Sequence, residues 1–330
     1  MSIAAQRPLG TSGLTVSAAA LGCNNLGRTG TATATLEGVR ELVGAALDAG
    51  ITFFDVADVY GAEPGLSERL LGQALQDLGA RPVVATKFGM KLAGLGEEYG
   101  PRGSRAYIRW AVENSLQRLQ IDVIDLYQYH QHDRVTPIEE TTEALQELVA
   151  EGKIRAFGHS NFAGWMIARA DAAARSAGGP TWVTAQDKYS LLDRVVESEV
   201  LPSSRAHGVS LIPYFPLENG LLTGKYSGGN RPEASRLVRE KPHLLEKANW
   251  EQLDRFSAFA KERGASEIAV AIGWLLAQQN VDTVIAGATK PEQVRQNAAE
   301  ALAWQPSEAD LAELDSIFPA VGPYGGFRPS

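Results

Sequence analysis

The chain has 330 residues, 44% of them hydrophobic and 21% charged, with a formal net charge of −8 at pH 7. This composition excludes a disordered chain and a coiled coil, and the acidic balance argues against nucleic acid as the main partner, because a phosphate binder needs a basic face. No apolar run reaches the ~18 residues that span a bilayer, the start lacks the apolar core of a signal peptide, and Cys23 is the only cysteine, so we expect a cytoplasmic protein without disulfides or a membrane partner.

Short β-branched runs alternate along the chain with stretches that carry apolar residues at helical spacing. The predicted strands are residues 19–23, 52–57, 83–87, 123–130, 154–159, 182–186, 210–215 and 283–287. The predicted helices that follow them are residues 36–49, 67–78, 104–119, 137–151, 163–177, 195–206, 267–279 and 291–302. Because alternating strands and helices form βαβ units with a parallel sheet, the pattern predicts the α/β class and a (β/α)8 TIM barrel.

Three segments lie outside this repeat. Residues 7–17 predict a β-hairpin that plugs the bottom of the barrel. Residues 217–247, rich in Gly, Pro and charge, form a long loop after the seventh strand and lead to an extra helix at 250–263. A last helix is expected at 307–318, with Ser307 as its N-cap. No polar linker divides the repeat, so we expect one domain spanning residues 1–330.

Polar side chains stand at the predicted carboxyl ends of the second, third and fourth strands, where barrels of this kind carry catalytic groups. Asp55 and Tyr60 follow the second strand, Lys87 ends the third, and His130 ends the fourth. A lysine and a carboxylate behind apolar strand residues are costly to bury unless they pair. An ammonium beside a phenol lowers the phenol pKa, which predicts Tyr60 as a general acid near neutral pH.

The residues alone leave other interpretations open. Taken singly, each residue also fits a purely structural role. Asp55 fits a helix cap, Lys87 a side chain whose ammonium reaches solvent past apolar neighbours, and His130 a histidine of the core. His130 and His132 form an H-x-H pair at a strand end, which is also found in metal-dependent barrel hydrolases. A Schiff-base lyase that uses Lys87 is a further alternative, although its lysine needs a pocket without a carboxylate partner.

Several segments together resemble the aldo-keto reductase superfamily: FFDVADVYG, VVATKFG, DLYQYH, QDKYSLLDR, PLENGLLTGKY and VIAGATKPEQVRQN. The resemblance runs over residues 7–318 and is closest to the bacterial long-loop branch, which is related to the potassium-channel β-subunits. It implies reduction of aldehydes or ketones to alcohols by hydride transfer from a nicotinamide. Tyr60 would donate the proton, Lys87 paired with Asp55 would tune it, and His130 would orient the carbonyl.

The resemblance also implies a set of cofactor-binding residues. Those for the carboxamide and the nicotinamide ring are Ser160, Asn161, Gln186 and Tyr214. Those of the segment over the pyrophosphate are Pro216, Leu217, Gly220, Leu221 and Lys225. Those for the adenosine-phosphate end are Gly287, Thr289, Lys290, Gln293 and Asn297, with Arg236 in the long loop.

The implied cofactor is NADPH (or NADP+), with NADH as the alternative. Gly287 and Gln293 stand where the short-loop branch has residues that grip the 2′-phosphate, so this contact falls to Lys290 and Arg236. No G-x-G-x-x-G follows any predicted strand, so a Rossmann site is not supported.

The expected partner is a small carbonyl substrate, and we expect no bound metal. The predicted substrate pocket takes Asn25, Phe88, Met90, Trp110, His132, Phe162 and Phe215, together with Tyr324 and Phe327 of the tail. The main alternative function is a slow or non-catalytic cofactor-binding redox sensor of the channel β-subunit type, and a metal-dependent barrel hydrolase is a minor one.

Overall fold

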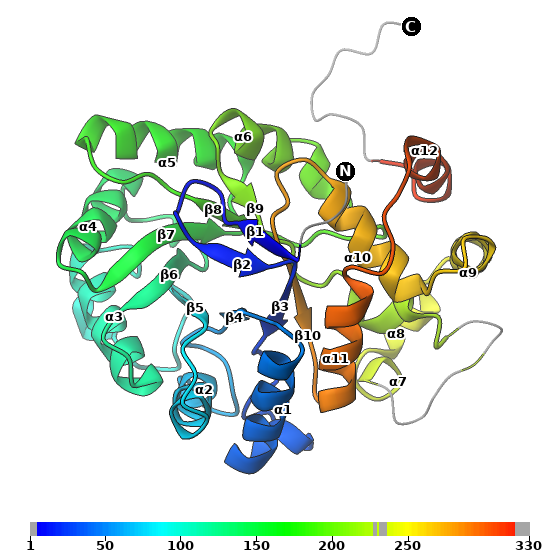
Figure 1. Cartoon of the computed structure of the whole chain (residues 1–330). Helices are drawn as coiled ribbons and strands as arrows, with labels where there is room; N and C mark the ends of the chain where they lie inside the picture. Colours follow the sequence, from blue (N-terminus) through cyan, green and yellow to red (C-terminus); the bar gives the residue numbers. More distant parts are fainter. Residues whose placement is uncertain (1–4, 227–229, 231–235, 321–330) are drawn as a thin grey trace, which may run out of the picture.

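A parallel barrel forms the centre of the computed structural model, which describes residues 5–226, 230 and 236–320 (Figure 1). Its strands are β3 (Ala19–Gly22), β4 (Phe53–Asp55), β5 (Val83–Phe88), β6 (Ile124–Tyr129), β7 (Ile154–Ser160), β8 (Thr184–Gln186), β9 (Ser210–Leu211) and β10 (Val284–Gly287). They are hydrogen-bonded in the order β10-β3-β4-β5-β6-β7-β8-β9. Parallel bridges from Leu211 to Val281 and from Tyr214 to Ile285 join the two ends of this sheet. The predicted (β/α)8 TIM barrel is therefore confirmed.

The barrel helices surround the strands (Figure 1). They are α1 (Leu36–Asp48), α2 (Leu66–Asp77), α3 (Arg105–Leu119), α4 (Ile138–Ala150), α5 (Gly164–Ala177), α6 (Val200–Ala206), α10 (Glu267–Ala277) and α11 (Pro291–Glu300). Several begin where a Ser, Thr or Asn side chain accepts a backbone N–H of the first turn; these N-caps are Thr35, Ser104 and Ser266. None of the helices in the described part of the chain combines the length and apolar character needed to cross a lipid bilayer.

One predicted helix, residues 195–206, is broken. A 3₁₀ turn, η3 (Val195–Glu197), precedes the shorter helix α6, which starts at Val200. Pro202 has no backbone N–H to donate. Because α6 starts at Val200, Pro202 lies in the first turn of the helix, where the backbone N–H groups have no partner within the helix. Two further 3₁₀ turns, η1 (Ala32–Ala34) and η2 (Glu97–Tyr99), lie in the loops after β3 and β5.

The predicted N-terminal hairpin is present and closes one end of the barrel (Figure 1). Strand β1 (Gln6–Pro8) pairs antiparallel with β2 (Thr15–Ser17). The hairpin side chains Leu9, Leu14 and Val16 pack in one buried cluster with inward-facing strand residues such as Phe53 and Leu126. Burial of these apolar side chains stabilises the packing of the hairpin against the end of the barrel.

The long segment between β9 and α10 folds into short helices. The described parts are the 3₁₀ turn η4 (Glu218–Thr223), α7 (Arg236–Glu240), α8 (Pro242–Glu246) and α9 (Trp250–Glu262). The predicted C-terminal helix is α12 (Glu308–Ile317), and Ser307 caps it through a capping box with Asp310. The tail residues Tyr324 and Phe327 lie outside the described residues.

Candidate active site

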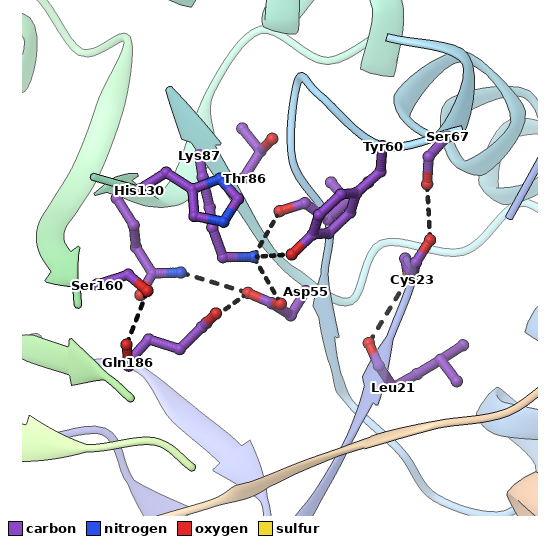
Figure 2. A network of polar contacts seen from close by, with 12 residues as sticks. Leu21, Cys23, Asp55, Tyr60, Ser67, Thr86, Lys87, His130, Ser160 and Gln186 are labelled. Atoms are coloured by element: carbon purple, nitrogen blue, oxygen red, sulfur yellow. Dashed lines mark hydrogen bonds and ion pairs between the residues drawn. The ribbon is translucent and has the colours of Figure 1, made fainter. Parts of the chain in front are cut away.

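Lys87 lies at the centre of a buried polar group at the carboxyl ends of β4 and β5. Its side chain is fully buried, and its Nζ donates to Asp55 Oδ2 at 2.7 Å and to the Val56 carbonyl at 2.9 Å. The same Nζ lies 3.5 Å from the Tyr60 hydroxyl. Figure 2 shows the ammonium between Asp55 and Tyr60, with the ring of His130 beside them. The structure thus brings together the four predicted catalytic residues.

Asp55 is held by donors from three other strands. Its Oδ1 accepts from Gln186 Nε2 at 2.8 Å and from Gln128 Nε2 at 3.3 Å, while Oδ2 takes the Lys87 ammonium. These partners fix the carboxylate opposite Lys87 and satisfy its charge away from water. Gln128 was not predicted; an amide in the apolar run of β6 is the signal that could have identified it, because a buried amide requires partners.

The pKa of Tyr60 differs from the expectation. Burial raises the pKa of the Tyr60 phenol, and although the Lys87 charge acts in the opposite direction, the pKa stays above its ordinary value. The predicted shift toward neutrality is therefore wrong, because the desolvation of the phenol outweighs the effect of the Lys87 ammonium. Burial also lowers the pKa of Lys87, but Asp55 and Tyr60 together raise it above the ordinary value, so the ammonium keeps its charge.

His130 presents a neutral imidazole to the group. Burial, and then the Lys87 charge, lower the pKa of His130 to about 3, so the ring is uncharged at pH 7. Its ring meets the Tyr60 ring edge to face, with centroids 5.8 Å apart. Nδ1 of His130 has no hydrogen-bond partner among the described residues. A neutral imidazole carries one N–H, which it can donate to a carbonyl oxygen.

A cavity of about 850 Å³ opens above these residues. Its wall includes the last residues of five strands, namely Gly22, Asp55, Ser160, Gln186 and Gly287, so it lies at the carboxyl-terminal face of the barrel. Tyr60 and His130 also line it, whereas Lys87 lies behind them. The other predicted residues that line it are Asn25, Asn161, Tyr214, Phe215, Pro216, Leu217, Gly220, Lys225, Thr289, Lys290, Gln293 and Asn297.

The amide residues of the cavity bind one another. Asn161 Nδ2 donates to the His130 carbonyl at 3.0 Å and to Ser160 Oγ at 2.9 Å, and the Tyr214 hydroxyl donates to Asn161 Oδ1 at 2.9 Å. Ser160 Oγ in turn donates to the Gln186 carbonyl at 2.7 Å. These residues place hydrogen-bond donors and acceptors next to one another beside His130. An amide ligand requires both, because its oxygen accepts and its NH2 group donates hydrogen bonds.

Four cationic side chains line the cavity. Arg28, Lys225, Arg239 and Lys290 all belong to its wall. Gln293 instead folds back on its own loop, where its Oε1 accepts from the backbone N–H of Thr289 at 2.9 Å. The volume lies within the range of small-molecule sites, about 300–1,000 Å³, and the charge suits a ligand with phosphates. The residues present therefore fit a nicotinamide dinucleotide.

Two cations of this wall, Arg28 and Arg239, were not predicted. Arg28 forms an ion pair with Glu240 of α7, which joins the loop after β3 to the segment after β9. Their signal in the sequence is weak, because a single arginine in a polar loop is usually solvated. The predicted Arg236 begins α7, but its side chain lies outside the described part of the chain.

Apart from Lys87, six of the predicted residues that the structure describes in full do not line the cavity. Phe88 is buried between Tyr127 and Tyr129, with ring centroids 4.8 and 4.9 Å away, and Phe162 is buried and stacks on His159 at 4.5 Å. The substrate-pocket assignment of Phe88 and Phe162 is therefore wrong, because both rings belong to the core. The others outside the wall are Met90, Trp110, His132 and Leu221.

The H-x-H pair does not converge. His130 faces the cavity, whereas His132 packs against Tyr129 and Phe162, and its Nδ1 accepts the backbone N–H of Arg134 at 2.8 Å. Within the described residues, no three His, Cys, Asp or Glu side chains come together as a possible metal site. The geometry therefore does not support the hydrolase alternative.

Comparison with known proteins identifies related sequences across almost the whole chain. The model of the Aldo/keto reductase family matches residues 19–318. An uncharacterized oxidoreductase, YrpG, from Bacillus subtilis (strain 168) is 39% identical over 324 residues, which cover 95% of this chain and 96% of the relative. Probable aldo-keto reductase 1 from Glycine max is 38% identical over 97% of this chain and 90% of its own length. L-glyceraldehyde 3-phosphate reductase from Escherichia coli (strain K12) is 34% identical over 94% of this chain and 91% of its own length.

Proposed function

The chain belongs to the aldo/keto reductase family, and from this premise we propose that it is an NADP(H)-dependent reductase of aldehydes and ketones. One observation carries the proposal. A protonated phenol, a buried ammonium and a neutral imidazole meet at a cavity whose wall also carries four cationic side chains.

In the proposed reaction each residue has a separate task. Tyr60 donates its proton to the oxygen of the substrate carbonyl, and its raised pKa keeps the phenol protonated until that oxygen becomes basic. Lys87 stabilises the phenolate that is left, because its ammonium is held in place by Asp55 and cannot be displaced by water. His130 donates its N–H to the same oxygen and stabilises the developing negative charge.

The same cavity offers the binding groups for the cofactor. Ser160, Asn161 and Gln186 would hold the carboxamide, and Tyr214 would face the nicotinamide ring. The wall segment that includes Pro216, Leu217 and Gly220 would cover the pyrophosphate, with Lys225 near it; Thr289, Lys290 and Asn297 would take the adenosine end. When bound, the nicotinamide supplies the hydride that reaches the carbonyl carbon.

A turnover assay tests the proposal. Purified protein is mixed with 4-nitrobenzaldehyde and either NADPH or NADH, and loss of the reduced-nicotinamide absorbance is followed. We expect multiple turnovers with NADPH. The relative named L-glyceraldehyde 3-phosphate reductase makes short phosphorylated aldehydes a useful part of a wider panel. Cofactor binding without turnover across the panel would instead indicate the redox-sensor alternative.

A further inference from the structure

The segment that follows β9 has an unusual backbone. Phe215, Glu218 and Asn219 have φ angles of +56°, +44° and +57°, and Gly220 has +104°. Left-handed φ angles are uncommon outside glycine, and they persist only where neighbouring groups hold them. Phe215, Asn219 and Gly220 also line the cavity. A strained stretch of backbone therefore forms part of the wall at which the cofactor pyrophosphate is proposed to lie.

Glu218 ties this strained segment to the loop after β8. Its side chain is buried, and its Oε1 lies 3.0 Å from Lys188 Nζ and accepts from Ser190 Oγ at 3.1 Å. Lys188 also contacts Asp193 Oδ2 at 2.9 Å. Although burial lowers the pKa of Lys188, its contacts with Asp193 and Glu218 raise it above the ordinary value, so the ammonium stays charged.

A second contact holds the same segment from the other side. Lys241, at the start of α8, donates from Nζ to Asn219 Oδ1 at 3.0 Å. The same ammonium lies 5.5 Å from the centroid of the Phe215 ring. Two lysines from different elements thus contact two adjacent residues with left-handed φ angles. Contacts of this kind are needed to hold a strained backbone in place.

We propose that Lys188 and Glu218 are positioning residues, whose ion pair holds residues 215–220 in the shape that binds the cofactor. The inference rests on the proposed function, since it concerns the same cavity. Without the pair, Lys241 is the remaining one of these two side-chain contacts on the strained residues, so the wall populates its binding shape less and the cofactor must restore it. The pair does not touch the catalytic group, so the step at saturating cofactor is expected to be unchanged.

Because Glu218 is charged, we expect the substitutions of Lys188 and of Glu218 to weaken NADPH binding to different extents. Lys188→Met leaves a buried carboxylate unpaired beside a site for phosphates, so it both frees the segment and repels the ligand. Glu218→Gln removes the charge and keeps the side-chain shape. We expect Lys188→Met to weaken NADPH binding about 10-fold and Glu218→Gln about 3- to 5-fold. The double variant is expected to bind NADPH more tightly than Lys188→Met alone, because its buried charge has gone.

The test measures NADPH affinity by quenching of tryptophan fluorescence, NADPH dissociation by stopped flow, and kcat and KM with a saturating aldehyde. The matched control is the exposed pair of Arg169 and Glu139, 3.2 Å apart on α5 and α4, changed to Met and Gln. Circular dichroism melts of all variants establish that they fold, and Lys188→Arg, which keeps the charge, should retain most of the affinity.

Three outcomes separate the ideas. A higher Kd and KM for NADPH, faster dissociation and an unchanged kcat in the Lys188 and Glu218 variants support the inference. If wild-type protein binds NADPH but these variants match the Arg169 and Glu139 controls, or lose kcat alone, the inference is overturned and the proposed function stands. Absence of NADPH binding by wild-type protein would overturn the proposed function itself.

Discussion

Competition between burial and paired charge sets the chemistry of the individual site residues. Tyr60 shows it most clearly, because desolvation raises its pKa while the Lys87 ammonium, 3.5 Å from its hydroxyl, lowers it. His130 has no opposite charge as a partner, so burial and Lys87 both lower its pKa. Tyr60 and His130 thus both stay neutral at pH 7, and of these three side chains only Lys87 carries a positive charge.

The sequence predicted which residues meet, but not their protonation. Asp55, Lys87 and His130 could be found because the ends of parallel strands converge in a barrel. Burial, by contrast, is a sum over the whole fold, so the net pKa of Tyr60 could not be worked out from one neighbouring charge. The same limit explains Phe88, whose ring turned out to lie between two tyrosines in the core.

Replacing Lys87 tests its effect on Tyr60. In Lys87→Met the opposing charge is gone, so the pKa of Tyr60 should rise further above its ordinary value. We expect kcat to fall at least 100-fold and the alkaline limb of the remaining activity to move to higher pH. The pH dependence of kcat/KM measures this, and an alkaline limb identical to that of wild type would rule out the coupling.

Asp58 offers a test of stability at the same scale. Its carboxyl is buried, neither oxygen has a hydrogen-bond partner among the described residues, and burial and then Glu68 raise its pKa well above the ordinary value. The folded chain therefore keeps a proton that the unfolded chain releases above about pH 4. This group costs stability as pH rises toward its folded pKa, by about 1.4 kcal/mol per pH unit.

Asp58→Asn keeps the shape and removes the titration. We expect the variant to gain stability relative to wild type as pH rises from 5 to 7, and the difference between the two to become independent of pH below about pH 4. Urea unfolding at several pH values gives the two free energies. Parallel curves for the two proteins would show that Asp58 does not titrate as described.

At the scale of elements, strand alternation decides which side chains enter the site. On β5, Lys87 points into the barrel, and its neighbour Thr86 donates to Glu68 of α2 outside it. Sequence patterns predicted all eight barrel strands, but β9 has only two residues where six were expected. Pro213 has no N–H for a ladder and Phe215 has a left-handed φ, so regular pairing stops early.

Two arginines attach the C-terminal helix α12: Arg263 at the end of α9 pairs with Asp310 and Glu313, and Arg194 holds the end of the helix. Arg194 is buried, and its Nη1 donates to Asp315 at 2.7 Å and to the Phe318 carbonyl at 2.6 Å. It also pairs with Glu197 and lies 5.1 Å from the ring of Trp274. One side chain thus joins the loop after β8, α10 and the end of α12.

Arg194→Met should destabilise the fold by about 2–4 kcal/mol, because it leaves Glu197 without its charged partner and removes a donor from the Phe318 carbonyl. Hydrogen exchange in α12 should increase more than exchange in α4. Arg169→Met, at an exposed ion pair, is the control and should change stability by less than about 0.5 kcal/mol. Equal effects of the two substitutions would contradict the role given to Arg194.

We expect the start of α11 to bind the 2′-phosphate of the cofactor. Lys290 is the N-cap of α11, is exposed, and lines the cavity. Because solvent screens an exposed charge, we expect Lys290→Ala to weaken NADPH binding by about 10-fold and to leave NADH binding nearly unchanged. Fluorescence titrations with both cofactors at fixed salt measure this. Equal losses for NADPH and NADH would mean that Lys290 shapes the loop instead.

At the scale of the whole molecule, the cavity is assembled from both ends of the chain. Strand β3 pairs with β10, and Asn25 Nδ2 donates to the Ala288 carbonyl at 3.3 Å across 263 positions of sequence. We propose on this basis that the chain is a single domain. The repeat of strands and helices made the barrel predictable, whereas the long-range contacts of Arg28, Gln128 and Arg194 depend on closure of the barrel, which no local pattern encodes.

The most direct test of the account follows the reduced carbon atom. Wild-type protein and Tyr60→Phe are incubated with 4-nitrobenzaldehyde and NADPH that carries deuterium at the transferable position of C4, and the alcohol is analysed by mass spectrometry. We predict one deuterium on the carbinol carbon with wild-type protein, and an alcohol yield at least 100-fold lower with Tyr60→Phe at equal NADPH binding. Alcohol without deuterium, or equal yields from the two proteins, would contradict direct transfer with Tyr60 as the proton donor.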